Sequence, residues 1–335
     1  MRIDSQVSLQ AYNTFGIAAG VDRLITVEAA EDLYSLKNEL KDGLVIGGGS
    51  NILLTQPRYE TVLVNRIREM EIVEEEDENV TIAVGSGENW HELVLWTLSQ
   101  DYGGLENLSL IPGTTGAAPI QNIGAYGVEV KDILVGLDYY RFKDQSIVFI
   151  SAEDCQFRYR DSIFKNEWKD QGFITKIYLR LSKRHHIIHK EYKALKVFLD
   201  TQGFTQPTIQ QISQAVIAIR QSKLPDWRKL GNAGSFFKNP VVPVSVYDRL
   251  VAQYPNLPFF RVDNEYIKIP AAWLIEQAGF KGKRFGDVGS YEFQPLVLVN
   301  YGGASGAELL ELMDKIQMKI RQLFGIELTP EVTIV

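Results

Sequence analysis

The sequence has few of the features that mark exported or membrane proteins. Its 335 residues contain one cysteine, Cys155, so no internal disulfide can form, and a lone thiol in a chain of this length fits a reducing compartment. No apolar run approaches the roughly 20 residues that a membrane helix needs. Residues 1–16 lack the basic-then-apolar order of a signal peptide. The sequence therefore predicts a cytoplasmic protein without membrane insertion.

Basic residues are outnumbered by acidic residues. The chain has 35 Lys and Arg against 42 Asp and Glu, a formal net charge of -7. A nucleic-acid surface would need a basic stripe that displaces counterions from phosphates, so this class of partner is excluded. Any anionic ligand must be bound by local Lys and Arg. The length, with 45% apolar residues, is sufficient for two or three packed units.

The first part of the chain reads as a mixture of strands and helices. Residues 22–65 alternate strand, helix (31–40), strand and strand, and 70–87 read as a hairpin with an acidic tip at 74–78. A helix with a buried face is expected after Asn89, and it should bury Trp90, Leu93, Val94, Thr97 and Leu98. Further strand-like segments run to about Leu181. The irregular order indicates an α+β fold and not a regular βαβ series.

A second region begins near Gln206. A helical pattern runs from there to Leu224-Pro225, a second helix spans 270–277, and a third starts at the capping box formed by Ser305 and Glu308. The third helix is expected to bury Leu309, Leu312, Met313, Ile316, Ile320 and Leu323. The segment 295–300 between the last two helices reads as a strand.

Two glycine-rich turns could bind phosphate. Gly47, Gly48 and Gly49, followed by Ser50 and Asn51, come directly after an apolar strand, where backbone N–H groups are free to cradle a diphosphate. A second turn at 85–87 also lies between a strand and a helix. Either alone is more often only a turn. Neither fits the G-x-G-x-x-G fingerprint or a P-loop, which excludes a dinucleotide-binding Rossmann domain and a P-loop kinase.

The segment 111–127 is more specific. It contains four glycines, two prolines and no charged residue, and it is too long and too apolar for an ordinary surface loop. It is either a buried connection in a core or backbone wrapped around a flat cofactor. A planar polar ligand such as an isoalloxazine ring would satisfy its N–H and C=O groups.

The motifs together resemble one family. In family order, across nearly the whole chain, the sequence is similar to UDP-N-acetylenolpyruvoylglucosamine reductases, in the subtype with a mobile tyrosine loop. The matching segments are Asn13-Thr14-Phe15, GGGSN (47–51), IPGTTGAAPIQNIGAYG (111–127), CQFRYRDSIFK (155–165), KLPD (223–226), GNAGSFFKNP (231–240), AAWLIEQAGFKG (271–282) and PEV (330–332).

The resemblance implies a fold, an activity and two cofactors. The fold would be a vanillyl-alcohol-oxidase or PCMH-like FAD-binding fold of two subdomains, 1–67 and 68–205, followed by an α+β substrate-binding domain, 206–335. NADPH would reduce a noncovalent FAD, and flavin N5 would deliver hydride to the β-carbon of UDP-N-acetylglucosamine enolpyruvate. The product, UDP-N-acetylmuramate, is a peptidoglycan precursor, so the activity would serve cell-wall biogenesis, cell shape and division.

The resemblance also assigns residues. Ser235 matches the proton donor to the α-carbon, Arg160 the arginine that faces the substrate carboxylate, and Glu331 an acid beside that carboxylate, which requires the two to share a proton. The residues expected at the FAD are Gly47, Gly48, Gly49, Ser50, Asn51, Ile111, Pro112, Gly113, Thr114, Gly116, Ala117, Ile120, Gln121, Asn122, Ile123 and Gly124. The residues expected at the substrate are Tyr159, Tyr192, Lys223, Asn239 and Gln294.

Simpler interpretations remain open for single residues. Without the flanking match, Ser235 would be a turn residue, Arg160 a surface ion-pair partner and Glu331 a solvated terminal residue. The segment around Tyr192 departs from the family loop and lacks its glycine. His185, His186 and His189 have no acidic or Cys partner at ligand spacing, so no metal site is predicted.

Two other functions compete with the reductase. One is a flavin oxidase of the same fold with oxygen as acceptor, and the other is a noncatalytic flavin or nucleotide-sugar binding protein. Ser235, Arg160 and Glu331 together favour the reductase, because binding alone does not require them. The sequence indicates no protein partner.

Overall fold

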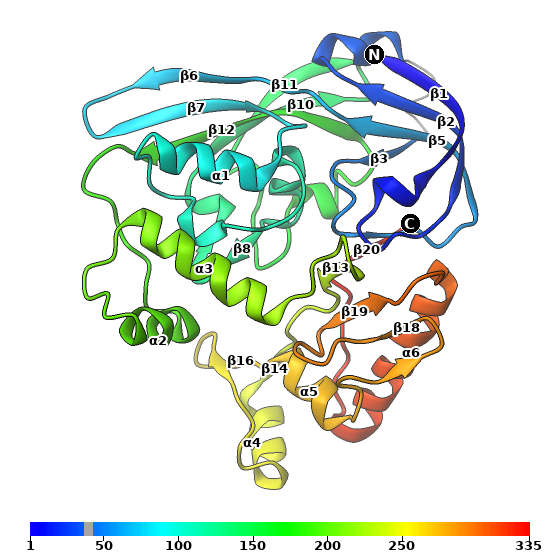
Figure 1. Ribbon diagram of the computed structural model, residues 1–335, viewed down its shortest axis with the longest axis vertical. Coiled ribbons are helices and arrows are strands. Elements are labelled where there is room, and N and C mark those ends of the chain that lie inside the picture. The colour runs from blue at the N-terminus through cyan, green and yellow to red at the C-terminus, as the bar shows by residue number, and fades with distance from the viewer. Residues whose placement is uncertain (37–42) are drawn as a thin grey trace. The chain divides into compact units, whose positions relative to one another are not determined.

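The computed structural model describes residues 1–36 and 43–335 (Figure 1). The chain divides into two compact units. Unit 1 comprises residues 1–7, 20–49 and 58–222, and unit 2 comprises 8–19, 50–57 and 223–335. The predicted boundaries at 67 and 205 stay predictions. Residue 67 lies inside unit 1, and the unit boundary nearest to residue 205 follows residue 222.

Unit 1 contains a four-stranded sheet near the N-terminus, in the order β1 (Arg2–Ser8), β2 (Gly20–Val27), β5 (Arg58–Asn65) and β3 (Leu44–Ile46). Strands β2 and β3 both run parallel to β5. The predicted strands of the 22–65 region are thus confirmed. The predicted helix at 31–40 is a 3-10 helix over Ala30–Ser35 (η2), and residues 37–42 lie outside the described part.

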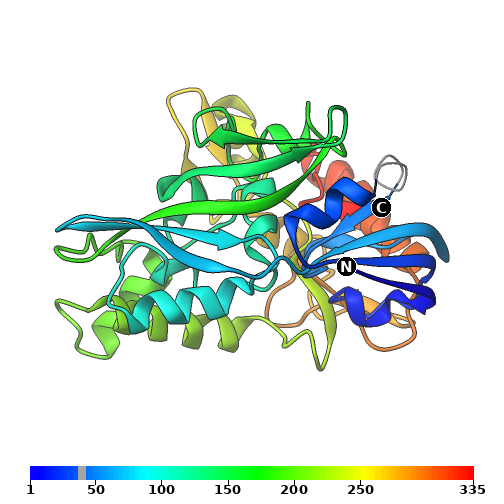
Figure 2. The ribbon, with the colours of Figure 1, turned by 90° about the horizontal axis from the view of Figure 1, so that it is seen from above.

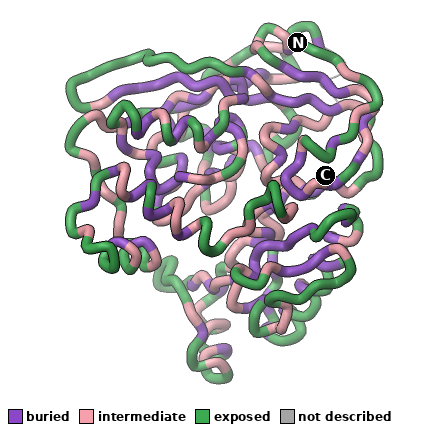
Figure 3. The backbone as a smooth tube through the Cα atoms, in the orientation of Figure 1, coloured by how far each residue is buried: buried purple, intermediate pink, exposed green. Residues whose placement is uncertain are grey.

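The second sheet of unit 1 has five antiparallel strands. Their order is β11 (Ser146–Ser151), β10 (Leu134–Arg141), β12 (Gly172–Ser182), β7 (Asn79–Gly85) and β6 (Met70–Glu75). Strands β6 and β7 form the predicted hairpin. Figure 3 shows the edge strand β6 exposed and its neighbour β7 largely buried.

Helix α1 (Trp90–Ser99) runs alongside this sheet (Figure 2). Its N-cap is Asn89, whose Oδ1 accepts a hydrogen bond from the N–H of Glu92 at 3.0 Å, which satisfies one free donor of the first turn. The five residues predicted to be buried are all buried, and Trp90, Leu93, Val94 and Leu98 join the core under β7, β10 and β12. The apolar spacing therefore predicted this helix and its inner face.

Two helices complete unit 1. The predicted helix before Leu224-Pro225 is α3 (Ile209–Lys223), and it packs against α2 (Lys193–Thr201), which the sequence analysis missed. Leu195 and Leu199 of α2 meet Ile212, Val216 and Ile219 of α3 in a small separate core. The segment 183–192 connects β12 to α2.

Unit 2 contains two small sheets and three helices. One sheet has the order β13 (Gly231–Ser235), β19 (Val297–Asn300), β18 (Val288–Ser290) and β17 (Arg284–Phe285). The other has the order β14 (Val241–Pro243), β16 (Tyr266–Lys268) and β15 (Phe260–Arg261). A further pair joins β20 (Thr333–Ile334) in parallel to β4 (Ile52–Leu53). The C-terminus is thereby attached to the segment 50–57.

The helices of unit 2 are α4 (Val244–Gln253), α5 (Ala271–Gln277) and α6 (Gly306–Phe324). Helices α5 and α6 were predicted and α4 was missed. The capping box is present, since the N–H of Ser305 donates to Glu308 Oε2 at 2.8 Å and the N–H of Glu308 donates to Ser305 Oγ at 3.3 Å. Leu323 was wrongly assigned to the buried face, because it is 37% exposed and Phe324 is buried in its place.

Candidate active site

The glycine loop 47–49 and the loop 111–124, both in unit 1, pack directly against each other. A Cβ built on Gly47 would lie 2.4 Å from Thr114 Oγ1, and one built on Gly48 would lie 2.7 Å from the Cα of Gly113. Real Cβ atoms do not approach so closely, so these positions require glycine. Arg66, just after β5, donates from Nη1 to the carbonyl of Gly47 at 3.2 Å and holds the first loop in place.

The loop 111–124 is also bonded to the second glycine turn. The N–H groups of Thr115 and Gly116 donate to the carbonyls of Glu88 and Ser86 at 3.0 and 2.9 Å, and Thr115 Oγ1 donates to Gly85 O at 2.6 Å. These groups were expected to need a ligand. The chain itself supplies their hydrogen-bond partners. This part of the loop is therefore a buried connection, the second of the two interpretations given for segment 111–127.

One buried group in this cradle has no partner. Among the described residues, no hydrogen bond reaches Thr114 Oγ1, although the atom is shielded from solvent. A buried hydroxyl without a partner is unfavourable, and it faces the glycines where a diphosphate was expected. Glycine backbone without side chains therefore lies next to a hydroxyl without a partner, and this arrangement fits a phosphate-bearing flat cofactor such as FAD. Gly47, Gly48, Gly113 and Thr114 would hold it.

The other predicted cofactor residues of this loop differ in accessibility. Pro112 and Ala117 are exposed, Ile111, Ile120, Gln121 and Gly124 are half-buried, and Gly116 and Ile123 are buried. A Cβ on Gly116 would lie 2.5 Å from that of Ser86, so this glycine is needed for packing against the 85–87 turn. Two 3-10 turns, η4 (Thr115–Ala117) and η5 (Pro119–Gln121), shape the loop.

Asn122 is fully buried and its side chain is occupied by the protein. Its Nδ2 donates to Glu129 Oε2 at 2.9 Å and to the carbonyl of Arg158 at 3.1 Å, and its Oδ1 accepts from the N–H of Lys131 at 3.1 Å. The residue adopts left-handed backbone, with φ of 46°. Its N–H donates to the carbonyl of Pro119 at 3.3 Å, so its side chain and its backbone both serve to fix the loop.

Arg160 lies in a tight turn of unit 1 between Arg158 and Asp161, whose backbones bond to each other. Its φ of 52° is left-handed, which costs a non-glycine residue about 1–2 kcal/mol. The guanidinium donates to the carbonyls of Asn122 and Gly124, lies 3.9 Å from Glu129 Oε1 and stacks over Tyr159 at 5.2 Å. Several contacts thus fix a strained residue, a pattern found at functional sites.

A second arginine was missed by the sequence analysis. Arg220, near the end of α3, is close enough to Arg160 and Tyr126 to interact electrostatically, and burial together with the positive charge of Arg160 lowers its pKa. Its Nε has no hydrogen-bond partner among the described residues. Both arginines are half-buried, and two interacting positive charges that are partly removed from water favour a bound anion. Arg220 lies one helical turn after the buried Val216. An arginine in line with the apolar face of a predicted helix is the sequence feature that could have identified Arg220.

In unit 2, the structure brings Ser235 and Glu331 together. The N–H of Glu331 donates to the carbonyl of Phe236 at 2.8 Å, and the N–H of Lys238 donates to Thr329 O at 2.9 Å. Asn51 joins them, because its Nδ2 donates to the carbonyl of Glu331 at 3.3 Å. Three separate motifs, GNAGSFFKNP, PEV and the end of GGGSN, therefore meet in one place.

Ser235 is positioned by its neighbours. It closes β13 opposite Val297, and the preceding Gly234 has a φ of 70°, a left-handed value that suits glycine. Asn232 holds this bend, since its Oδ1 accepts from the N–H of Gly234 at 3.0 Å. Ser235 is half-buried, so its hydroxyl is held on a shaped turn and not in a solvated loop.

The predicted substrate residues differ in how they are engaged. Gln294 has a buried Oε1 without a partner among the described residues, so it offers a free acceptor. Asn239 caps α5, since its Oδ1 accepts from the N–H of Ala271 at 2.9 Å. Lys223 is exposed at the end of α3. Tyr192 is 44% exposed and its ring meets that of Tyr126 edge-on at 5.3 Å.

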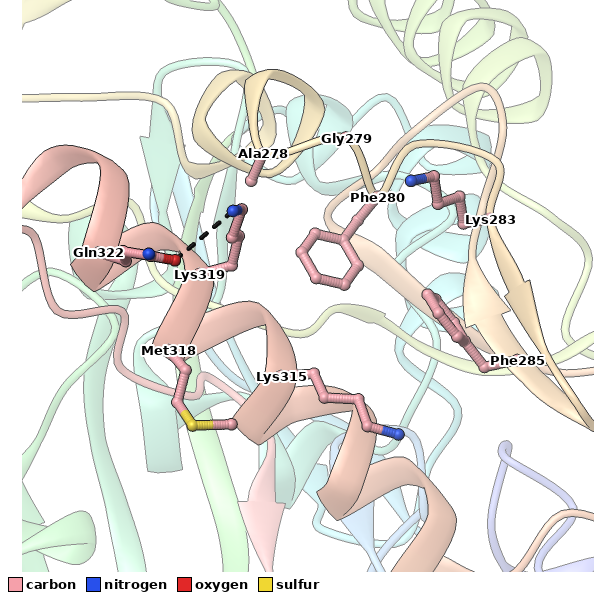
Figure 4. Close-up of a pocket in the computed structure, with 9 residues that line it drawn as sticks. All are labelled: Ala278, Gly279, Phe280, Lys283, Phe285, Lys315, Met318, Lys319 and Gln322. Carbon is pink, nitrogen blue, oxygen red and sulfur yellow. Dashed lines mark hydrogen bonds between the residues drawn. The ribbon is translucent and has the colours of Figure 1, made fainter.

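A separate groove of about 440 Å³ in unit 2 contains none of the predicted site residues (Figure 4). It is lined by Phe280 and Phe285 from the segment after α5 and by Lys315, Met318 and Lys319 from α6. Within the described residues, no group of three His, Cys, Asp or Glu could hold a metal ion. No helix in residues 1–36 and 43–335 is long and apolar enough to span a membrane.

Comparisons with known proteins agree with this geometry. The model of an FAD binding domain matches residues 41–148, and the model of the UDP-N-acetylenolpyruvoylglucosamine reductase C-terminal domain matches residues 226–335. The chain is 45% identical to the UDP-N-acetylenolpyruvoylglucosamine reductase of Flavobacterium johnsoniae over all of both chains. It is 44% identical to that of Pseudomonas putida over 97% of each.

A solved structure shows the same fold. The crystal structure of UDP-N-acetylenolpyruvylglucosamine reductase from Thermus caldophilus matches with a TM-score of 0.71 and 22% identity, covering 100% of this chain and 99% of that one. The predicted α+β fold with an FAD-binding part followed by a substrate-binding part is confirmed. The chain belongs to the UDP-N-acetylenolpyruvoylglucosamine reductase family, as its motifs had indicated.

Proposed function

We propose that this protein uses NADPH to reduce UDP-N-acetyl-3-O-(1-carboxyvinyl)glucosamine to UDP-N-acetylmuramate, with Ser235 as the proton donor. The observation that carries the proposal is the pairing of the segment around Ser235 with the segment around Glu331. These motifs are far apart in the sequence and lie side by side in unit 2. A protein that only bound flavin would have no need for these two segments to pair.

The bound cofactor, FAD, supplies hydride-transfer chemistry in a flat ring system. The protein must then stabilise negative charge that develops on the α-carbon and carboxylate of the substrate, and must deliver one proton. Arg160 suits the first task, because a guanidinium fork fits a planar carboxylate and keeps its charge throughout. Its fixed geometry means that little rearrangement is needed when the charge develops.

Ser235 is a weak acid, so it can protonate only a strongly basic carbon. The α-carbon that carries the negative charge after hydride transfer is such a base. A hydroxyl fixed on a turn can deliver its proton to one face of this carbon. Glu331 would share a proton with the substrate carboxylate, which lessens the repulsion between the two groups. The triad therefore divides the work into charge stabilisation, proton delivery and proton sharing.

Arg220 supports an anionic ligand in unit 1. It lies near Arg160 with an unbonded Nε, and the substrate carries both a carboxylate and a diphosphate. We assign Tyr159, Tyr192, Lys223, Asn239 and Gln294 to substrate contacts, and Ser50 and Asn51 to the cofactor side. Since a nucleotide sugar and NADPH are intracellular metabolites, we propose that the protein works in the cytoplasm.

The test is a spectroscopic titration of the purified protein without oxygen. NADPH should bleach the yellow flavin absorbance, and the enolpyruvyl sugar nucleotide should restore it, with UDP-N-acetylmuramate as the product by mass spectrometry. If this substrate did not restore the flavin absorbance of the reduced protein and only oxygen did, the protein would be an oxidase and the proposal would fail.

A further inference from the structure

Asn107 lies in the 3-10 helix η3 (Glu106–Leu108) of unit 1. Asn107 is completely buried. Its Nδ2 donates to two backbone carbonyls, that of Tyr126 at 2.9 Å and that of His189 at 2.8 Å. An amide nitrogen has two hydrogens, and both are used here. One side chain thereby links the end of the 111–127 loop to the segment that leads to Tyr192.

The helix η3 provides a firm support for this link. Trp90 Nε1 donates to the carbonyl of Leu108 at 3.1 Å, and His91 Nδ1 accepts from the N–H of Leu110 at 3.0 Å. Both partners lie on α1, whose inner face is part of the main core. Asn107 is therefore a fixed point, and the two segments that it binds are placed relative to α1.

The two linked segments carry tyrosines that meet each other. The rings of Tyr126 and Tyr192 are 5.3 Å apart and lie nearly perpendicular at 75°. Tyr126 has left-handed backbone, with φ of 50°, so its backbone is held in a conformation that it would not keep without support. The carbonyl bonded by Asn107 belongs to this strained residue.

Tyr126 of this pair is a neighbour of the two arginines, Arg220 and Arg160. Tyr126 interacts electrostatically with Arg220, and Arg220 with Arg160. Arg160 itself donates to Gly124, two residues before Tyr126. A shift of the Tyr126 backbone would therefore reach both arginines and the Tyr192 ring.

We propose that Asn107 is a positioning residue for the sugar-nucleotide side of the site, because its amide fixes the backbones of Tyr126 and of the Tyr192 segment in one arrangement beside Arg220. This inference rests on the proposed function. Asn107 touches neither the cofactor loop 47–49 nor the Ser235 turn in the hydrogen bonds described above, so its effect on the reaction passes through the tyrosines.

The experiment compares Asn107→Ala and the milder Asn107→Ser with the wild type. The variants should raise both the KM for the enolpyruvyl sugar nucleotide and its Kd for the oxidised holoenzyme by about tenfold, the effect of losing one to two net hydrogen bonds. The Kd is read from the change in flavin absorbance, which does not depend on turnover. FAD content should equal that of the wild type.

A matched control separates positioning from loss of stability. Tyr140 is buried in a third core of unit 1, which includes Leu33 and Phe173, and its hydroxyl donates to the carbonyl of Leu33 at 3.3 Å. Tyr140→Phe removes a buried donor to a backbone carbonyl, as Asn107→Ala does. It should lower the melting temperature and leave the KM and Kd for the sugar nucleotide unchanged.

The coupling to Tyr192 is tested by a double-mutant cycle. In a Tyr192→Ala background, Asn107→Ser should raise the Kd by a smaller factor than in the wild-type background, because the Tyr192 ring, one of the two groups that Asn107 positions, is gone. An unchanged Kd in the Asn107 single variants, or an equal loss in both backgrounds, would overturn the proposal. A wild-type protein that does not respond to the sugar nucleotide at all would instead refute the proposed function.

Discussion

The close packing of the two glycine loops makes Gly48→Ala the most informative single substitution. The backbone of Gly48 is not left-handed, so alanine suits its conformation, and the effect comes from the added methyl group alone. That methyl would lie 2.7 Å from the Cα of Gly113, whereas ordinary contacts begin at 3.4 Å, so the loops must separate by about 0.7 Å (3.4 minus 2.7). Because the obstructing atoms are backbone, no side-chain rotation relieves the contact.

The expected cost follows from this displacement. Overpacking a close contact costs about 1–3 kcal/mol, which corresponds to a loss of about 5- to 150-fold in FAD affinity if the FAD-bound form is strained by that amount. The dissociation constant is measured by titrating the apoprotein with FAD and following flavin fluorescence.

Gly203→Ala is the control. Gly203 follows α2 in unit 1, has a φ of 75° and has no atom within 4 Å of a built Cβ. Alanine there should cost about 1 kcal/mol of stability through its backbone, with FAD affinity unchanged. A Gly48→Ala protein that binds FAD as tightly as the wild type would refute the idea that these loops form the cofactor cradle.

Three further predictions concern single side chains. Ser235→Ala should leave flavin reduction by NADPH unchanged and slow reoxidation by the sugar nucleotide at least about 100-fold in stopped-flow experiments, and two fast half-reactions would rule out this serine as the acid. Burial raises the pKa of Glu106, so the native state holds this proton more tightly than the unfolded chain, and stability falls as pH rises through that pKa. Glu106→Gln should therefore stabilise the protein increasingly in thermal melts as the pH rises above the ordinary pKa of a glutamate, and a gain that does not depend on pH would contradict this reasoning. Burial raises the pKa of Cys155 to about 12, so iodoacetamide should label it at about pH 8 only after unfolding, and rapid labelling of the native protein would show that the thiol is accessible.

The helices that the sequence predicted are those with a clear apolar face. Helix α1 has five buried residues at helical spacing, and α6 adds a capping box, so both could be identified from the pattern. Helix α4 was missed because it buries only Leu250 and starts among β-branched residues that favour strands. Helix α2 is nine residues long, and its stripe buries against α3, a contact that no local pattern reveals.

The site shows the same division. The glycines and the motif residues could be assigned from the sequence, because their types and order are specific. The proximity of the Ser235 and Glu331 segments arises from backbone hydrogen bonds between residues far apart in the sequence, and the orphaned atoms of Thr114, Arg220 and Gln294 depend on packing. These are tertiary facts, and periodicity carries no information about them.

The division of the chain has a consequence for how the protein can be produced in parts. The chain passes between the two units after residues 7, 19, 49, 57 and 222. A C-terminal fragment cut at the start of the reductase family domain, residue 226, would lack β4, the partner of β20, and Thr14, whose carbonyl accepts from the N–H of Asn232. Both the C-terminal strand and the bend that presents Ser235 would lose a backbone partner. Unit 2 is thus made from segments at both ends of the sequence, and its folding can be completed only when the last residues of the chain can meet segments made at the beginning.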